Sequence, residues 1–159
     1  MEININPNID DNFYRYKMPD LIIKNDTKLT KIVNLNDIAT VLNIPSTILL
    51  KYFSVVLGTN SNHKKLTING KYDKKHLLNT LYKFIESYII CKKCTIPELN
   101  FTYNNKDINI TCSACGQNYK MESTNNIDLK IIDQFKTHIK KNGPIMIKTY
   151  QNHIDMSFN

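Results

Sequence analysis

Four cysteines carry the strongest chemical signal in this sequence. Cys91 and Cys94 enclose two residues, Cys112 and Cys115 enclose another two, and 17 residues separate the pairs. Two tight turns that each offer two thiolates suit tetrahedral zinc, and the C-x2-C-x17-C-x2-C spacing is typical of a zinc ribbon. Because four protein ligands leave no coordination position open, we expect the zinc to be structural rather than catalytic.

Two other interpretations of the cysteines are two disulfides or a dithiol redox pair. The chain begins MEININPNID, which lacks the basic and then apolar layout of a secretory signal, so disulfides are disfavoured. Redox chemistry needs one such motif where this chain has two. Lys92 and Lys93 favour the thiolate form, and Gly116 suits the turn of a zinc knuckle.

A second candidate site lies in the stretch NFYRYKMPDL near the start of the chain. It places Arg15 between Tyr14 and Tyr16, followed by Lys17 and Pro19. A guanidinium stays charged at physiological pH and offers a planar fork of donors to phosphate oxygens. From the residues alone, the simpler interpretation is that Arg15 stacks on a neighbouring tyrosine and fastens this segment by a cation–π contact.

Composition sets outer limits on fold and partners. The 159 residues are 42% hydrophobic and 22% charged, which suits one core of fair size or two small ones. A net charge of +7 favours an anionic partner such as RNA, a ribosome or an acidic protein face. No apolar run approaches the roughly 20 residues that span a bilayer, so we expect a cytoplasmic protein without a membrane partner.

The periodicity of apolar residues predicts an α+β fold. Residues 1–20 show no helical stripe and are predicted to form an extended N-terminal arm. Short apolar runs at 21–24 and 31–35 predict a hairpin, and residues 66–68 a further strand. Asn36 is a suitable cap for a short helix, and a second helix opens at Ser46 and stops at Gly58.

The rest of the chain divides at the cysteines. Asp73 caps the longest helical pattern, which runs into the first cysteine pair, and short alternating segments then predict small strands. From 128 to 142, Leu129, Ile132, Phe135 and Ile139 predict the apolar face of a closing helix. We therefore expect an arm (1–20), an α/β domain (21–90), a C4 zinc ribbon (91–122), a closing helix region (123–144) and a tail (145–159).

Several of these segments, in this order, resemble a known family. NFYRYKMPDLIIK, VNLNDIATVLNIPSTILLKYFSVVLG, the strand ending in NG, the long helix and CKKC with CSACG look like the N-terminal domain of eukaryotic translation initiation factor five. The resemblance covers about residues 1–144. The beta subunit of initiation factor two is similar in the α/β part and the ribbon but does not share FYRYKMP, so this motif discriminates.

The resemblance implies a function. The family stimulates GTP hydrolysis by the gamma subunit of initiation factor two in the preinitiation complex and contributes to start-codon selection. By resemblance, Arg15 is the arginine finger, delivered in trans, and Tyr14, Tyr16 and Lys17 surround it at the partner. The protein is then not itself an enzyme, and GTP is bound only by the partner; the sequence accordingly has no Gly-rich phosphate loop.

The resemblance also implies further partners and residues. It places an α/β domain with the fold of initiation factor one on the small ribosomal subunit, near initiator tRNA and rRNA. Lys51 matches a supporting lysine of the family, although a solvated lysine on an amphipathic helix explains it equally well. A second supporting lysine falls at Lys28 or Lys31. The four histidines show no ligand spacing and are predicted to lie on the surface.

Two departures from the family leave alternatives open. Asp20 follows Pro19 where the family tends to carry a basic residue, and an aspartate could pair with Arg15 and blunt it. Full members also continue into an acidic linker and a C-terminal helical-repeat domain that this sequence does not include. The alternatives are a ribosome- and tRNA-binding module, or a mimic of the factor-two beta subunit, in either case without GTPase activation.

Overall fold

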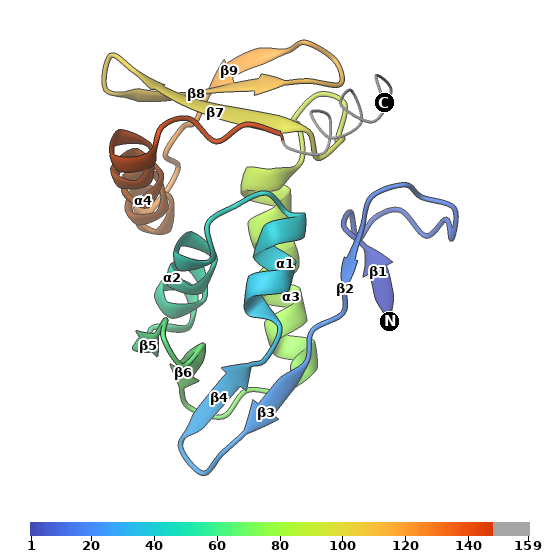
Figure 1. The fold of residues 1–159 in the computed structure, drawn as a ribbon, viewed down its shortest axis with the longest axis vertical. Helices are drawn as coiled ribbons and strands as arrows, with labels where there is room; N and C mark the ends of the chain where they lie inside the picture. Colours follow the sequence, from blue (N-terminus) through green and yellow to red (C-terminus); the bar gives the residue numbers. More distant parts are fainter. Residues whose placement is uncertain (148–159) are drawn as a thin grey trace, which may run out of the picture.

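The computed structural model describes residues 1–147, in which four α-helices and one π-helical turn accompany three antiparallel sheets (Figure 1). The helical elements are α1 (Leu35–Val41), α2 (Ser46–Leu57), α3 (Lys74–Phe84), η1 (Ile85–Ile89) and α4 (Asn126–Asn142). The strands are β1 (Glu2–Asn4), β2 (Lys17–Pro19), β3 (Ile23–Asn25), β4 (Leu29–Ile32), β5 (Ser61–Asn62), β6 (Thr67–Asn69), β7 (Leu99–Asn104), β8 (Asp107–Cys112) and β9 (Asn118–Lys120). The mixed α/β character expected from the sequence is thus confirmed.

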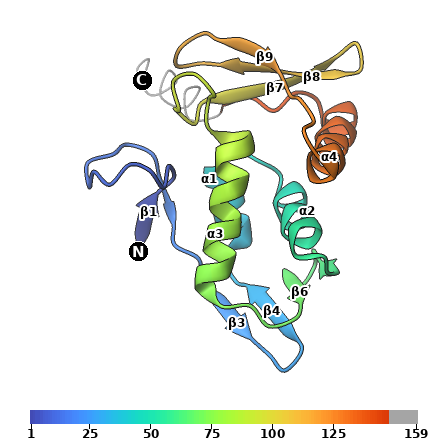
Figure 2. The ribbon, with the colours of Figure 1, turned by 180° about the vertical axis from the view of Figure 1, so that it is seen from behind.

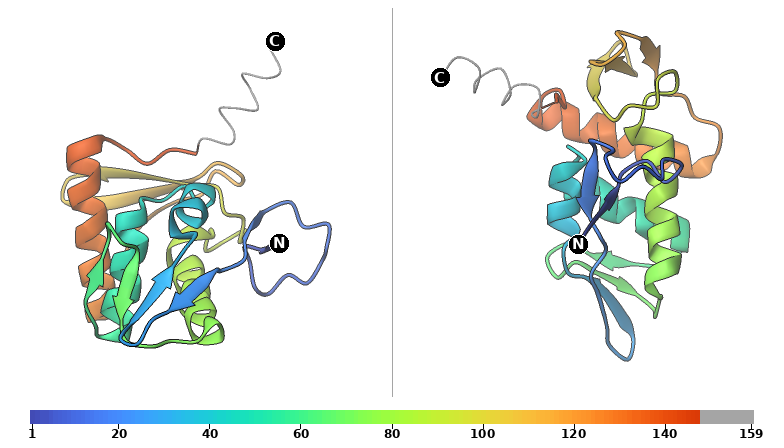
Figure 3. Two further views of the ribbon diagram at one scale, coloured as in Figure 1. Left: turned by 60° about the horizontal axis from the view of Figure 1, so that its bottom comes forward. Right: turned by 90° about the vertical axis from the view of Figure 1, so that its right-hand side faces the viewer.

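A four-stranded sheet of order β3-β4-β6-β5 forms the base of the α/β part, and α1, α2 and α3 pack over one of its faces (Figure 3, left). Strand β4 alternates as its sequence requires: Thr30 and Ile32 are buried, whereas Lys31 is exposed. The predicted hairpin corresponds to β3 and β4, paired from Ile23 opposite Ile32. The two-residue strand β5 was not predicted from the sequence.

Local signals end and begin the long helices. Gly58, at φ 65°, terminates α2 in the left-handed conformation that glycine adopts without strain. Asp73 caps α3 by accepting a hydrogen bond from the backbone N–H of His76 at 2.7 Å. Both predictions are confirmed. The predicted cap Asn36 was wrong, because α1 begins at Leu35 and Asn36 lies inside the helix. Asn34 occupies the N-cap position, but its side chain makes no capping hydrogen bond; it binds the carbonyl of Asp20 and the N–H of Ile22 instead.

The long helix changes pitch before the first cysteine. Residues 85–89 form the π-helical turn η1, which ends with a hydrogen bond from the N–H of Ile90 to the carbonyl of Ile85 at 3.1 Å. A π-turn adds one residue to the α-helical repeat. This turn carries the chain from the α/β part to the three-stranded sheet β7-β8-β9. The sheet lies at the top of the molecule in Figure 1, and Figure 2 shows it from behind.

Helix α4 joins the two parts of the molecule. It packs against α2 on one side and against β7 and β8 on the other. Phe135 of α4 lies 5.0 Å from the ring of Phe101 and 6.0 Å from that of Tyr88, measured between centroids. The buried residues therefore form one continuous core. Leu129 was predicted on the buried face of this helix, but its side chain is 56% exposed; Ile131 is buried instead.

The first 20 residues differ from the predicted extended arm. Strands β1 and β2 pair antiparallel, with Ile3 opposite Met18, and close residues 5–16 into a loop. Ile5 and Met18 are buried in the common core, which explains the closure, because alternating apolar residues in both strands face the same side. We call residues 5–16 the arginine loop.

Beyond α4 the chain returns to the ribbon. Ile145 exchanges two backbone hydrogen bonds with Phe101, at 2.8 and 3.0 Å, on the edge of β7. The predicted tail thus begins as a bridge to the sheet, and its residues 148–159 lie outside the described residues. In the part of the chain that the structure describes, no single helix is long and apolar enough to cross a membrane; α1 and α2 meet these criteria only together, with a 113° bend.

Candidate functional site

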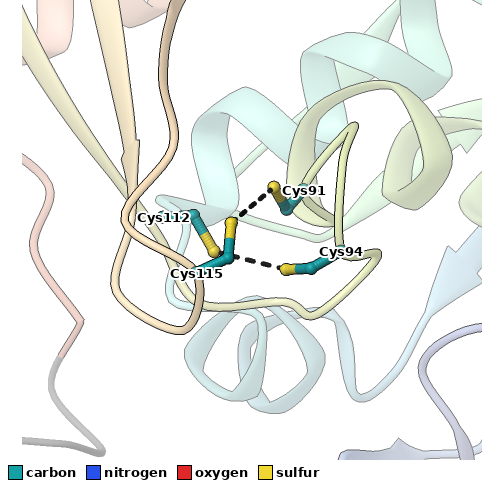
Figure 4. Close-up of side chains that lie close together, drawn as sticks. All are labelled: Cys91, Cys94, Cys112 and Cys115. Atoms are coloured by element: carbon teal, nitrogen blue, oxygen red, sulfur yellow. Dashed lines mark hydrogen bonds between the residues drawn. The ribbon is translucent and has the colours of Figure 1, made fainter.

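The four cysteines converge from two turns, as predicted (Figure 4). The Sγ atoms of Cys91 and Cys115 are 3.7 Å apart, those of Cys94 and Cys112 are 3.6 Å apart, and all four lie within 4.8 Å of one another. All four are free thiols. A tetrahedral ion with Zn–S bonds of about 2.3 Å holds its sulfur ligands about 3.8 Å apart. The cluster therefore has the size of a metal site.

Backbone groups shape both turns around the sulfurs. The N–H of Thr95 donates to the carbonyl of Cys91 at 2.9 Å, and the N–H of Gly116 to that of Cys112 at 2.8 Å. Gly116 has φ +76°, a conformation that residues with a Cβ rarely adopt. The N–H of Lys93 also points at the Sγ of Cys91, at 3.4 Å. The backbone of both turns thus has the hydrogen bonding expected of zinc knuckles.

The thiols differ in acidity. Burial opposes ionisation of Cys91, but the backbone N–H groups of Cys94 and Lys93 and the neighbouring thiols outweigh it and lower its pKa to about 7. Burial raises the pKa of Cys112 to about 12 and also raises that of Cys94. Three or four thiolates in this volume need a compensating cation, which a bound metal ion supplies.

The arginine loop presents Arg15 to solvent on the far side of α1 and α3 from α2 and α4 (Figure 3). Its guanidinium carbon lies 5.5 Å from the ring centroid of Tyr16. The neighbouring Phe13 is 93% exposed, an unusual position for a large apolar side chain. Arg15 thus makes the predicted cation–π contact and is exposed to solvent among the described residues.

The tyrosines beside Arg15 hold the loop in place. The hydroxyl of Tyr16 donates to Oε1 of Glu98 at 2.6 Å, across 82 residues of sequence. Burial, and then this hydrogen bond, raise the pKa of Tyr16 to about 12. Tyr14 packs edge-on against Tyr16, with centroids 5.6 Å apart. Glu98 lies between the first cysteine pair and β7, so the loop is anchored to the ribbon.

Asp20 does not neutralise Arg15. Its carboxylate forms a salt bridge with Lys74 at 2.6 Å, and its side chain is 16% exposed. Its other oxygen accepts the N–H of Leu21 at 2.8 Å. The aspartate is therefore bound at the start of α3.

Of the other predicted basic residues, Lys51, Lys28 and Lys31 lie on elements remote from the arginine loop, whereas Lys17 lies on the strand that closes it. Lys51 is exposed on α2, where it lines a shallow groove with Lys130 of α4. Lys28 and Lys31 are exposed in the hairpin of β3 and β4, at the end of the molecule opposite the ribbon (Figure 1). Lys17 donates to Oδ1 of Asn4 at 2.7 Å and so supports the pairing of β1 with β2.

Two features of the arginine loop were missed from the sequence. Arg15 is the only arginine among 21 basic residues, the other 20 being lysines. The chain uses lysine at every other such position, and the guanidinium of Arg15 differs from an ammonium group in offering a planar fork of donors. This signal was readable in the composition. The anchor Glu98 had no sequence signal, because only folding brings it to Tyr16.

Comparisons with known proteins agree with the geometry. The family model for the domain found in initiation factors 2B and 5 matches residues 6–118. The chain is 35% identical to eukaryotic translation initiation factor 5 of Caenorhabditis elegans over 152 residues, covering 91% of this chain and 33% of that protein. The mouse protein of the same name is 37% identical, with 73% and 29% covered, and that of Dictyostelium discoideum 34%, with 96% and 38% covered. The chain thus spans about a third of the length of these relatives.

Proposed function

Since this chain belongs to the family of the domain found in initiation factors 2B and 5, we propose that it is a translation initiation factor that stimulates GTP hydrolysis by the gamma subunit of initiation factor two. In this proposal the chain is not itself an enzyme. It supplies Arg15 to the nucleotide site of its partner within the preinitiation complex, and hydrolysis there contributes to start-codon selection.

The exposed guanidinium of Arg15 on an anchored loop is the observation that carries the proposal. Negative charge develops on the transferring phosphoryl group, and a preorganised cation stabilises that charge more than it stabilises the ground state. A side chain held by its own fold would be unable to reach a neighbour's site. Because Asp20 is paired with Lys74, no carboxylate from that position offsets the charge.

We further propose that the cysteine cluster binds one structural zinc ion. Cys91, Cys94, Cys112 and Cys115 would supply all four ligands, and their sulfur spacing fits. Bound zinc would contribute folding free energy and no reaction chemistry. The ribbon holds Glu98, so the metal would also support the anchor of the arginine loop.

The remaining partners follow from the family. We propose that the protein acts in the cytoplasm on the small ribosomal subunit, beside initiator tRNA and rRNA, with residues 21–90 adopting the fold of initiation factor one. Its net charge of +7 suits such partners. Helix α2, which carries Lys51, lies on a different side of the molecule from the arginine loop, so the support of this lysine would act through a separate contact of the assembled complex.

The test is single-turnover GTP hydrolysis on assembled initiation complexes. We expect Arg15→Ala to lose most of the acceleration, which for a finger in trans is about 10³- to 10⁵-fold. Arg15→Lys keeps the positive charge but lacks the planar fork of donors, so it should retain only a small part of the acceleration. Lys141→Ala, which removes an exposed charge at the end of α4, is the matched control and should hydrolyse at the wild-type rate.

Equal rates for the wild type and both Arg15 variants, with undiminished ribosome binding, would contradict GTPase activation. The protein would then be a ribosome- and tRNA-binding module or a mimic of the factor-two beta subunit. Binding of the isolated gamma subunit separates these two outcomes, because only the mimic requires it.

A further inference from the structure

A shallow groove of about 450 Å³ lies on the ribbon beside the cysteine cluster, and no residue of the arginine loop lines it. Its walls come from the first cysteine turn and from β9 with the residues around it. The lining residues are Lys92, Lys93, Gln117, Tyr119, Lys120 and Glu122. The function proposed above leaves this surface without a role.

The groove combines an aromatic ring with ammonium groups. Nζ of Lys92 lies 5.6 Å from the ring centroid of Tyr119, and Nζ of Lys93 donates to Oε1 of Gln117 at 3.2 Å. The ring itself is fixed, because Tyr119 is half-buried against the core and its hydroxyl accepts the N–H of Lys92 at 3.4 Å. Three lysines thus line the same groove as one positioned aromatic side chain, and one of them, Lys92, lies over its ring.

The charge balance of the groove is positive. Lys92, Lys93 and Lys120 face a single lining carboxylate, Glu122. A second carboxylate, Asp107, pairs with Lys120 at 3.2 Å, but both side chains are about half exposed or more, and such a surface pair is weak. Within residues 1–147, the contacts of these ammonium groups are with a ring, an amide and a carboxylate rather than with cysteine sulfur.

We propose that this groove binds single-stranded RNA, with the lysines on phosphates and Tyr119 stacked against an unpaired base. Stacking on an aromatic ring is the main sequence-tolerant contact that proteins make with single strands, and basic groups beside the ring follow the backbone. A duplex keeps its bases paired and would leave Tyr119 unused. The site is independent of Arg15, and its test uses the purified zinc-loaded protein alone.

Fluorescence anisotropy with a labelled single-stranded uridine oligonucleotide of about 10 residues tests the proposal. Lys92→Gln with Lys93→Gln should weaken binding about 25-fold at about 0.1 M salt and reduce the salt slope by about 1.4, or about 0.7 for each lost phosphate contact. Tyr119→Leu should weaken binding about tenfold or more without changing the slope, whereas Tyr119→Phe should bind as the wild type does.

The matched control is Lys140→Gln with Lys141→Gln on α4. Lys140 also lies over a tyrosine ring, 5.0 Å from the centroid of Tyr103, so this pair removes the same charge from a similar contact. An equal loss in the control would overturn the proposal, because binding would then follow net charge alone. Equal affinity for a duplex, or wild-type affinity of Tyr119→Leu, would overturn it as well. Zinc content is measured in every variant. If the variant Lys92→Gln with Lys93→Gln contains less zinc than the wild type, the affinity of Tyr119→Leu for the oligonucleotide decides whether the proposal stands.

Discussion

The arginine loop and the first cysteine turn present the same arrangement on different supports. In each, a cation lies over a tyrosine ring at nearly the same distance: Arg15 at 5.5 Å from Tyr16, and Lys92 at 5.6 Å from Tyr119. The arginine loop is closed by a short strand pair and one hydrogen bond to Glu98. The first cysteine turn carries Cys91 and Cys94, two of the four clustered thiols that could hold a metal ion.

The difference shows what each loop depends on. The arginine loop is held by buried apolar residues and backbone pairing, which persist wherever the core persists. The cysteine turn has little apolar core of its own, and with zinc bound as proposed its stability would depend on the ion. One contact, from Tyr16 to Glu98, connects the two, so loss of the metal should weaken the arginine loop without unfolding it.

The largest expected effect is the loss of a metal ligand. Cys112→Ser should abolish zinc binding and remove amide-exchange protection from β7, β8 and β9, because metal binding supplies much of the ribbon's folding free energy. Protection in α4 should fall as well, since Phe135 packs on Phe101, whereas α2 and α3 should stay protected. Ala114→Ser, a change in the same turn that leaves all four ligands, is the control. Full protection of the sheet in Cys112→Ser would refute metal dependence.

A smaller effect is expected from the polar contact between η1 and the start of α4. Asp128 accepts hydrogen bonds from the hydroxyls of Tyr88 and Thr124. Burial raises its pKa, but these hydrogen bonds outweigh burial and hold the pKa below its ordinary value of 3.8. Asp128→Asn should therefore cost about 2 kcal/mol of unfolding free energy at neutral pH.

The sign of the pH dependence follows from that lowered pKa. The stabilisation by Asp128 is complete above about pH 5 and disappears as pH falls through the folded pKa, where the carboxylate is protonated in both states. The unfolding free energies of wild type and Asp128→Asn in urea should differ at about pH 6, and this difference should shrink steadily as the pH falls below about 4. Any loss of zinc at low pH affects both proteins, so the difference between their unfolding free energies at each pH reports on Asp128. A difference that is constant with pH would contradict this assignment.

The hydrogen bond from Tyr16 to Glu98 should contribute less to the unfolding free energy than Asp128 does. Tyr16→Phe removes the hydrogen bond to Glu98 and should lower the unfolding free energy by about 1.5 kcal/mol. Tyr103→Phe is a suitable control, because within residues 1–147 its hydroxyl makes no hydrogen bond. If both variants unfold at the same urea concentration, the arginine loop is not anchored through Glu98.

The smallest effect is expected at Phe13. Its side chain is 93% exposed, so Phe13→Ala should change the unfolding free energy by less than about 0.5 kcal/mol. Met18→Ala, at a fully buried position of the same segment, should cost about 2 to 5 kcal/mol. Thermal unfolding of the two variants measures how sharply the loop divides into a buried base and an exposed tip. A large loss in Phe13→Ala would contradict that division.

The sequence was sufficient where a structural feature depends on adjacent residues. Gly58 and Asp73 mark helix ends through their own backbone and side-chain chemistry, and the cysteine spacing predicts the cluster because each pair occupies one turn. It was insufficient where distant residues meet. The closure of the arginine loop depends on β1 and β2 finding a common core, and Asn34 gives its side chain to backbone groups of another segment rather than to a helix cap.

The π-helical turn determines the direction in which the chain leaves the long helix and reaches the cysteine cluster. Deleting one residue from 85–89 would restore the ordinary helical repeat and rotate everything that follows by about 100°. Cys91 comes two residues after this turn. Such a deletion would leave every ligand in the sequence and still swing the first pair of sulfurs away from the second. The length of the helix, counted to a single residue, is thus as necessary to the ribbon as its cysteines.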